Sequence, residues 1–397
     1  MKKWKSISCM CMLAGALVFQ PLAVSADQPE NSPGTPDQQN YKIKGFVDYE
    51  ELEQRLEKIE QTSNGRVDVE VIGQSNQGRD IYSARIGDGD KVVLIESEIH
   101  GNEKTGTDAL LHILQYLGSS NSTHAEKIRE ELTFVAVPKM NPDASELDRR
   151  GNERSWEEVV ADFPQLEGAV PSWNYYNRSL QGDDYSDNPG FDVNRDFHPD
   201  LQYEPQPEDF PGSSSEPGWY IHPESQTIRD LYIDLQDEFG SVDTFIDLHH
   251  QGPHYKVGET NKDVTMSISA QFVPNPNSED GAKYSSYADN YNYDFSRQLN
   301  VAIYNKLQQG NSPFNNITLY SQGLDLPGTA LGSFALNGSG TVLFEVRGQT
   351  HSFGQKKRGQ LVKTVETGLY AVLEGMADGS VYEQDPERYE DIPLTNR

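Results

Sequence analysis

Two short segments of the sequence carry side chains that could hold one metal ion together. His100 and Glu103 stand three residues apart, where a strand-like run gives way to a helical pattern. A second strand-like run, residues 242–248, leads directly into His249 and His250. Zinc takes imidazole nitrogen and carboxylate oxygen, and in catalytic sites three protein ligands leave one position for water. The first segment offers two ligands, so one of the two later histidines is expected to supply the third.

The runs before these residues predict that both segments reach the same edge of a sheet. Residues 92–95 and 242–248 are short, as expected for strands buried in an α/β sheet. Ligand sites in open α/β sheets collect at the carboxyl ends of strands, which is where both segments lie. Neighbouring side chains on an extended chain point to opposite faces, so only one of His249 and His250 is expected to reach the ion.

The rest of the chain predicts an α/β fold, because β-rich runs alternate with helical spacing of apolar residues. The runs that predict strands are 67–72, 81–86, 92–95, 132–137, 242–248 and 342–346. The runs that predict helices are 48–61, 105–117, 224–239, 294–309 and 360–376. Such alternation is typical of a sheet with helices on both faces.

Two stretches break this alternation. Residues 151–223 are rich in proline, glycine, aspartate and aromatic residues, and residues 267–293 form a second expected loop region. Long irregular loops in a compact domain are usually functional rims or lids, although tolerated surface insertions are an equal alternative. Residues 380–397 are acidic and are expected to form a loose tail.

The first 26 residues predict a secretory signal peptide. They contain three lysines near the start, an apolar run at 10–19 that is too short to span a bilayer, and small residues at 23–26, where cleavage is expected. Cys9 and Cys11 are the only cysteines and both lie in this segment, so the mature chain would have no disulfide and no thiolate metal site. Residues 27–40 are polar and proline-rich, which predicts a flexible lead-in.

Charge and missing motifs exclude several classes of function. The formal net charge of −29 at pH 7 argues against nucleic acid and anionic membranes as partners. The sequence contains no Gly-x-Ser-x-Gly and no His-Glu-x-x-His. It therefore lacks both the nucleophile elbow of serine hydrolases and the thermolysin-type zinc motif.

Five motifs in order along the chain resemble those of the zinc carboxypeptidases of the A/B type. The His-x-x-Glu segment with its later histidine strand is one of them. The others are Ser75–Arg79, Asn141–Asp143, Gly190–Asp196 and Phe344–Arg347. The resemblance covers about residues 41–376. It implies a single catalytic domain, residues 41–379, with a mixed, twisted eight-stranded sheet and helices on both faces.

The resemblance also implies roles for the residues that could carry the reaction. His100, Glu103 and His249 match the ligands of a single Zn²⁺ ion. Glu345 matches the general base, and a carboxylate inside a strand pattern would be costly to bury without a function or a partner. An ion pair between Glu345 and Arg347 is the structural alternative.

Four residues match groups that contact the substrate. Asn194 and Arg195 match the pair that grips the terminal carboxylate, a task suited to the planar guanidinium. Arg150 matches the arginine that polarises the scissile carbonyl, although Arg149 beside it leaves the register open. Tyr320 is the candidate for the mobile tyrosine that closes over the substrate.

The function implied by the resemblance is that of a secreted zinc metallocarboxypeptidase. It would hydrolyse the C-terminal peptide bond of peptides with a free C-terminal carboxylate, as a monomer. The alternative is a γ-D-glutamyl-diamino acid peptidase acting on peptidoglycan stem peptides. Two further hypotheses are a deacylase of N-acyl amino acids and a protein that binds peptides without cleaving them. The side-chain preference is expected to be set near Ala330 or Leu331, where no charge stands, and this disfavours basic terminal residues.

Overall fold

The structure is a computed structural model that describes residues 45–309, 312, 314–348 and 354–397. The predicted signal peptide (1–26) and lead-in (27–40) lie outside the described residues.

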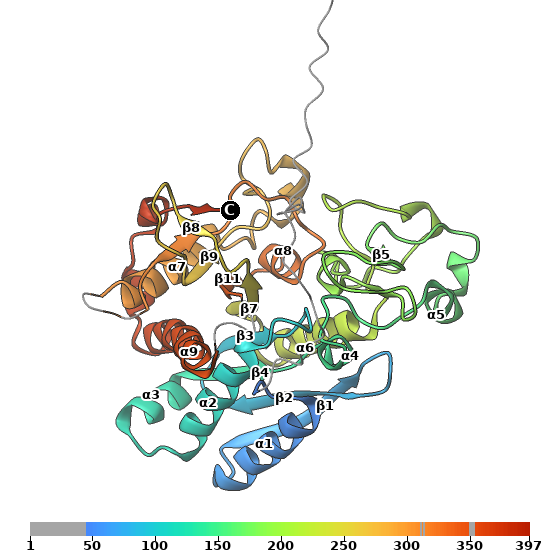
Figure 1. The fold of residues 1–397 in the computed structure, drawn as a ribbon. Coiled ribbons are helices and arrows are strands. Elements are labelled where there is room, and N and C mark those ends of the chain that lie inside the picture. Colours follow the sequence, from blue (N-terminus) through green and yellow to red (C-terminus); the bar gives the residue numbers. More distant parts are fainter. Residues whose placement is uncertain (1–44, 310–311, 313, 349–353) are drawn as a thin grey trace, which may run out of the picture. The chain divides into compact units, whose positions relative to one another are not determined.

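An eight-stranded mixed sheet runs through the described chain (Figure 1). Its strands, in spatial order, are β1 (Val67–Gln74), β2 (Asp80–Ile86), β4 (Leu132–Val137), β3 (Lys91–Ser97), β7 (Thr244–Gln251), β11 (Gly340–Arg347), β9 (Met266–Ser269) and β10 (Ile317–Leu319). The central strands β4, β3, β7 and β11 are parallel, so their carboxyl ends meet at one edge. The predicted α/β class and eight-stranded sheet are confirmed.

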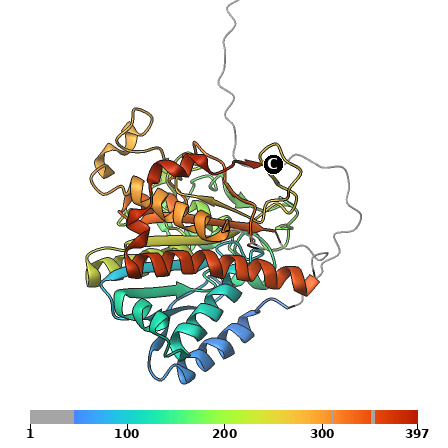
Figure 2. The ribbon, with the colours of Figure 1, turned by 90° about the vertical axis from the view of Figure 1, so that its left-hand side faces the viewer.

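Helices cover both faces of the sheet. One face packs against α1 (Tyr49–Thr62), α2 (Thr105–Ser119), α7 (Tyr293–Leu307) and α9 (Gly354–Asp378). The other packs against α6 (Pro223–Phe239) and α8 (Ala330–Leu336). Figure 2 shows α9, in red, lying lengthwise across the first face. No helix among the described residues is long and apolar enough to cross a membrane.

The structure adds several elements that the sequence did not predict. They are α3 (Thr123–Glu131), α8, β9 and β10, of which the last three have seven residues or fewer. Elements this short show too few repeats for apolar periodicity to identify them. Strand β7 also extends to Gln251, so His249 and His250 lie within it rather than after it.

The predicted loop region 151–223 forms an irregular layer with its own small core. It contains α5 (Trp156–Asp162) and a two-stranded ribbon of β5 (Tyr175–Tyr176) and β6 (Gly190–Phe191). Its core residues are Trp156, Val159, Leu166, Phe191, Phe210, Trp219 and Ile221. Asp196 fastens the layer to the start of α6, because its carboxylate accepts the backbone N–H groups of Ile221 and His222 at 3.1 and 2.9 Å.

The expectation of a loose tail at 380–397 is wrong. Val381, Tyr389 and Ile392 are buried in the main core. Leu394 then bridges to Leu319 of β10, and β12 (Thr395–Asn396) pairs with β8 (Lys256–Val257) in a separate two-stranded sheet. The acidic composition suggested a solvated segment, but these three apolar side chains are enough to fix it against α7 and the sheet.

Candidate active site

The three metal-ligand candidates converge where His100 and Glu103 follow β3 and His249 lies in the last part of β7. The Nδ1 atoms of His100 and His249 lie 3.1 Å apart. Glu103 places Oε1 3.2 Å from His100 Nδ1 and Oε2 2.8 Å from His249 Nδ1. Ligand atoms about 2.0 Å from a tetrahedral zinc ion lie about 3.3 Å from one another. The donor set and its spacing therefore fit one zinc ion.

The turn after β3 directs the first two ligands through an uncommon backbone conformation. Glu98 has a φ of 57°, a left-handed conformation that costs a non-glycine residue about 1–3 kcal/mol. Its buried carboxylate is fixed by Lys139 Nζ at 2.6 Å and by the hydroxyl of Thr107. Gly101 follows because a Cβ there would lie 1.9 Å from the carbonyl carbon of Ala144. Contacts distant in sequence thus set the direction of the His-x-x-Glu segment.

Each candidate histidine turns its other ring nitrogen toward a buried aspartate. His100 Nε2 lies 3.1 Å from Asp192 Oδ1, and His249 Nε2 lies 2.7 Å from Asp247 Oδ2. A carboxylate in this position holds the proton on Nε2 and leaves Nδ1 available to a metal. Neither aspartate was predicted as a functional residue. Two sequence features could have identified them. Asp192 belongs to the Gly190–Asp196 motif, and Asp247 stands two residues before His249.

The electrostatics of this cluster favour a cation. Burial alone would lower the pKa of His249, but Asp247 and Glu103 outweigh it and keep that pKa well above its usual value. Burial would raise the pKa of Glu103, yet His100 and His249 bring it well below its usual range. Glu96 is fully buried beside Asp247 in the sheet register, and burial followed by that aspartate raises its pKa well above normal. Burial therefore favours the neutral form of Glu96, whereas the histidines favour the ionised form of Glu103.

His250 has a separate structural task. Its Nε2 accepts the backbone N–H of Thr105, the first residue of α2, at 3.0 Å. Burial lowers its pKa to about 4, which keeps the ring neutral as an acceptor must be. Its own backbone N–H donates to Glu103 Oε2 at 3.0 Å. The structure thus places His249 with the ligand candidates and uses His250 to cap a helix.

Of the two neighbouring arginines, Arg150 faces the site. Its Nη1 lies 3.3 Å from His100 Nδ1, and its Nη2 donates to Asp192 Oδ2 at 2.8 Å. Arg149 instead donates to backbone carbonyls of the surrounding loops. The two side chains diverge after a left-handed residue, Asp148, with a φ of 50°.

Asn194 and Arg195 lie beside the ligands in the short turn η2 (Val193–Arg195). Asn194 Nδ2 is 3.3 Å from His249 Nε2, and its Oδ1 accepts the backbone N–H of Ala330 at 3.1 Å. Arg195 is 8% exposed and donates to the Asn194 carbonyl at 2.6 Å. The structure therefore brings the predicted carboxylate-binding pair and the start of α8 together.

Glu345 lies in β11 in register with His249 of β7. Burial raises its pKa to about 8, with His249 acting against this shift and Glu103 adding to it. A cation bound nearby would lower that pKa. Arg347, the alternative partner of Glu345, pairs with Asp263 at 2.9 Å.

Tyr320 follows β10 and lies near Glu345. Burial and then the charge of Glu345 raise the pKa of its phenol. Arg150 acts on the same phenol in the opposite direction, so both predicted charged groups are within electrostatic reach of this ring. The structure thus places the predicted tyrosine near the general-base candidate.

A family model described as zinc carboxypeptidase matches residues 52–328. The chain belongs to this family. Zinc carboxypeptidase A 1 of Drosophila melanogaster is 26% identical over 128 residues, which cover 30% of this chain and 30% of that relative. The match thus spans less than a third of the relative's length.

Comparison with solved structures gives one superposition that shows the fold of this chain. Thrombin activatable fibrinolysis inhibitor superposes with a TM-score of 0.53 at 15% identity, covering 88% of this chain and 81% of that chain. A putative carboxypeptidase A from Shewanella denitrificans OS-217 gives a TM-score of 0.48 at 18% identity, covering 84% and 70%. The first of these agrees with the eight-stranded architecture described above.

The zinc carboxypeptidase match ends before β11, so Glu345 lies outside the matched residues. The register of β11 against β7 independently places this carboxylate beside a ligand candidate. Strand pairing therefore connects Glu345 to the site where the sequence match does not reach.

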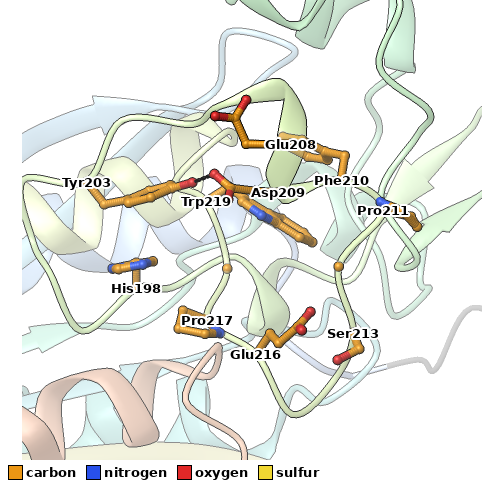
Figure 3. Close-up of a pocket in the computed structure, with 12 residues that line it drawn as sticks. His198, Tyr203, Glu208, Asp209, Phe210, Pro211, Ser213, Glu216, Pro217 and Trp219 are labelled. Carbon is orange, nitrogen blue, oxygen red and sulfur yellow. Dashed lines mark hydrogen bonds between the residues drawn. The ribbon is translucent and has the colours of Figure 1, made fainter. Parts of the chain in front are cut away.

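The chain also has a pocket of about 500 Å³ in the loops between residues 198 and 219 (Figure 3). His198 stacks on Tyr203 with ring centroids 4.0 Å apart, and the Tyr203 hydroxyl donates to Asp209. None of the predicted site residues lines this pocket. It is therefore distinct from the candidate active site.

Proposed function

We propose that the protein is a zinc-dependent carboxypeptidase that hydrolyses the C-terminal peptide bond of peptides with a free C-terminal carboxylate. The observation that carries the proposal is the convergence of His100, Glu103 and His249 on one point, with Glu345 in register beside it. When bound, zinc supplies Lewis-acid polarisation and a water of lowered pKa.

Glu345 and Arg150 carry the proton transfer and the stabilisation of charge in this proposal. The Glu345 carboxylate takes a proton from the attacking water and returns it to the leaving amine. It is not a ligand candidate, so its oxygens remain available for that proton. Arg150 presents its guanidinium next to His100, where it can donate to the carbonyl oxygen as negative charge develops there. Asp192 orients His100 and Arg150, because its carboxylate contacts both side chains.

Substrate binding falls to the neighbouring residues. Arg195, with Asn194, receives the terminal carboxylate, for which a guanidinium offers paired hydrogen bonds. Tyr320 covers the bound end. Ala330 and Leu331 are buried and uncharged at the start of α8, which favours a neutral terminal residue over a basic one.

The proposal includes secretion and action as a monomer. The pattern of residues 1–26 supports export, and every site residue comes from one chain. Amino-terminal sequencing of protein recovered from culture medium tests the cleavage after residue 26. Sedimentation analysis tests the monomer.

The activity is tested by mass spectrometry of a peptide library incubated with the protein, with and without a chelator. The library contains free peptides, C-terminally amidated versions and peptidoglycan stem peptides. Chelator-sensitive loss of single residues from free C-termini alone is the expected result. Cleavage confined to stem peptides would replace the proposal with the γ-D-glutamyl peptidase, and no cleavage of any peptide would reject both.

A further inference from the structure

The C-terminal segment of the chain packs beside β10, the strand that leads into Tyr320. The backbone N–H of Leu319 donates to the Pro393 carbonyl at 2.8 Å, and that of Gly258 donates to the Leu394 carbonyl at 2.9 Å. Thr395 Oγ1 donates to the Leu319 carbonyl at 2.7 Å. Residues 393–396 therefore lie between β10 and β8, fixed by backbone hydrogen bonds on both sides.

A row of polar side chains connects this segment to Glu345. Ser267 of β9 is the direct register partner of Glu345 in β11. The hydroxyl of Ser267 lies 2.7 Å from that of Thr395 and 3.0 Å from that of Thr318. Directly opposed residues of antiparallel strands share a face. Thr395 is therefore on the Glu345 side of the sheet.

Arg397 follows this strand and lies over the ring of Tyr320. Its guanidinium lies 4.3 Å from the ring centroid of Tyr320 and 5.7 Å from that of Tyr255. Burial raises the pKa of both Tyr320 and Glu345, and the positive charge of Arg397 acts against that rise in each case. Among the described residues, no Asp or Glu side chain forms an ion pair with this guanidinium.

Arg397 and Asn194 occupy different sides of Glu345. Asn194 contacts β7 through His249, whereas Arg397 lies over Tyr320 at the end of β10. In the sheet, β11 with Glu345 stands between β7 and the pair β9–β10. A peptide with its terminal carboxylate at Asn194 and its scissile bond at Glu345 would extend its preceding residues toward Arg397.

We propose that Arg397 forms a second cationic subsite, which binds an acidic side chain of the peptide on the amino-terminal side of the scissile bond. This inference rests on the proposed carboxypeptidase activity and specifies its substrate class. An exposed guanidinium stacked on an aromatic ring keeps its donors free for a carboxylate. Such a pair contributes modestly and is screened by salt.

The test compares peptides that differ only by glutamate or glutamine at the second, third or fourth position from the C-terminus. The wild-type protein is expected to show a kcat/KM about two- to fivefold higher for glutamate at one of these positions, at low salt. Arg397→Gln is expected to bring that ratio to about 1, and Arg397→Glu to reverse it in favour of a lysine peptide. Arg388→Gln removes the same charge from an exposed part of the same segment and should leave the ratio unchanged.

Three outcomes overturn the inference. A wild-type protein without preference at any position has no such subsite, and a preference that survives in Arg397→Gln comes from another residue. An equal loss of rate for glutamate and glutamine peptides in Arg397→Gln would mean that the arginine only steadies Tyr320. If the wild-type protein releases C-terminal residues and one of these three results is found, the subsite inference fails and the proposed function stands. If it releases none from any peptide, the proposed function fails with it.

Discussion

The two sides of the candidate active site are built in different ways. On the side of β3 and β7, each ligand histidine has a buried aspartate behind it, at 3.1 and 2.7 Å, and Glu103 accepts a backbone N–H at 3.0 Å. On the side of β10 and β11, strand register and packing place Glu345 and Arg397, and no hydrogen bond joins their charged groups to another described residue. The first side is preorganised to hold an ion, and the second keeps its charged groups available for a proton and a substrate.

Removing a ligand should have the largest effect, because the metal side depends on three atoms. His249→Ala is expected to lower zinc affinity by more than about 100-fold, beyond the loss that outer-shell changes cause. His250→Ala should keep the metal and cost about 1 kcal/mol of stability, as the loss of a helix cap does. Zinc content after dialysis and the unfolding midpoint measure the two effects. Loss of zinc from His250→Ala but not from His249→Ala would show that His250 is the ligand.

On the other side, Glu345→Gln should abolish most activity and leave the metal in place. The variant retains the shape of the side chain and loses the proton acceptor, so about 2–4 kcal/mol of transition-state stabilisation should disappear. The measurement is kcat/KM together with zinc content. Glu238→Gln, at an exposed ion pair with Arg85, is the matched control and should behave as wild type. Near-normal turnover in a zinc-loaded Glu345→Gln variant would remove this residue from the mechanism.

The aspartates behind the histidines allow a finer test of the metal side. Asp247→Asn and Asp192→Asn should each weaken zinc binding by about 10–100-fold, because the amide no longer fixes the ring tautomer. Asp192 also binds Arg150 at 2.8 Å, so only Asp192→Asn should lower kcat in the zinc-saturated protein as well. Chelator competition gives the affinity, and assays at saturating zinc give kcat. Equal kcat values in the two variants would show that Arg150 does not need this anchor.

The same contrast explains what the sequence could predict. His100, Glu103 and the pair His249 and His250 stand out because metal binding needs particular atoms near strand ends, and buried strands leave a recognisable pattern. The choice of His249 within that pair came from the family resemblance. The β3 and β4 strands, buried almost throughout, were predicted within a few residues of their observed bounds. Local pattern thus located the metal side.

The opposite side depends on contacts that no local pattern contains. Thr395 meets Ser267 across 128 residues, and Arg397 meets Tyr320 through the path of a segment whose composition suggested a loose tail. The choice of Arg150 over Arg149 likewise depends on a left-handed turn at Asp148. Neighbouring identical side chains cannot be told apart until that turn is known.

The smallest expected effect concerns the proton on Glu345. Burial raises its pKa to about 8 without a metal, above the usual carboxyl value, so the protonated form is favoured at pH 7. Zinc favours the ionised form, and binding should release that proton at pH 7 but little of it at pH 9. Zinc titration calorimetry in buffers of different ionisation enthalpy measures the release. The number of protons released by the wild type minus the number released by Glu345→Gln gives the contribution of Glu345 alone, without that of the histidines. Equal proton release by the two proteins at pH 7 would show that Glu345 is already ionised before the metal binds.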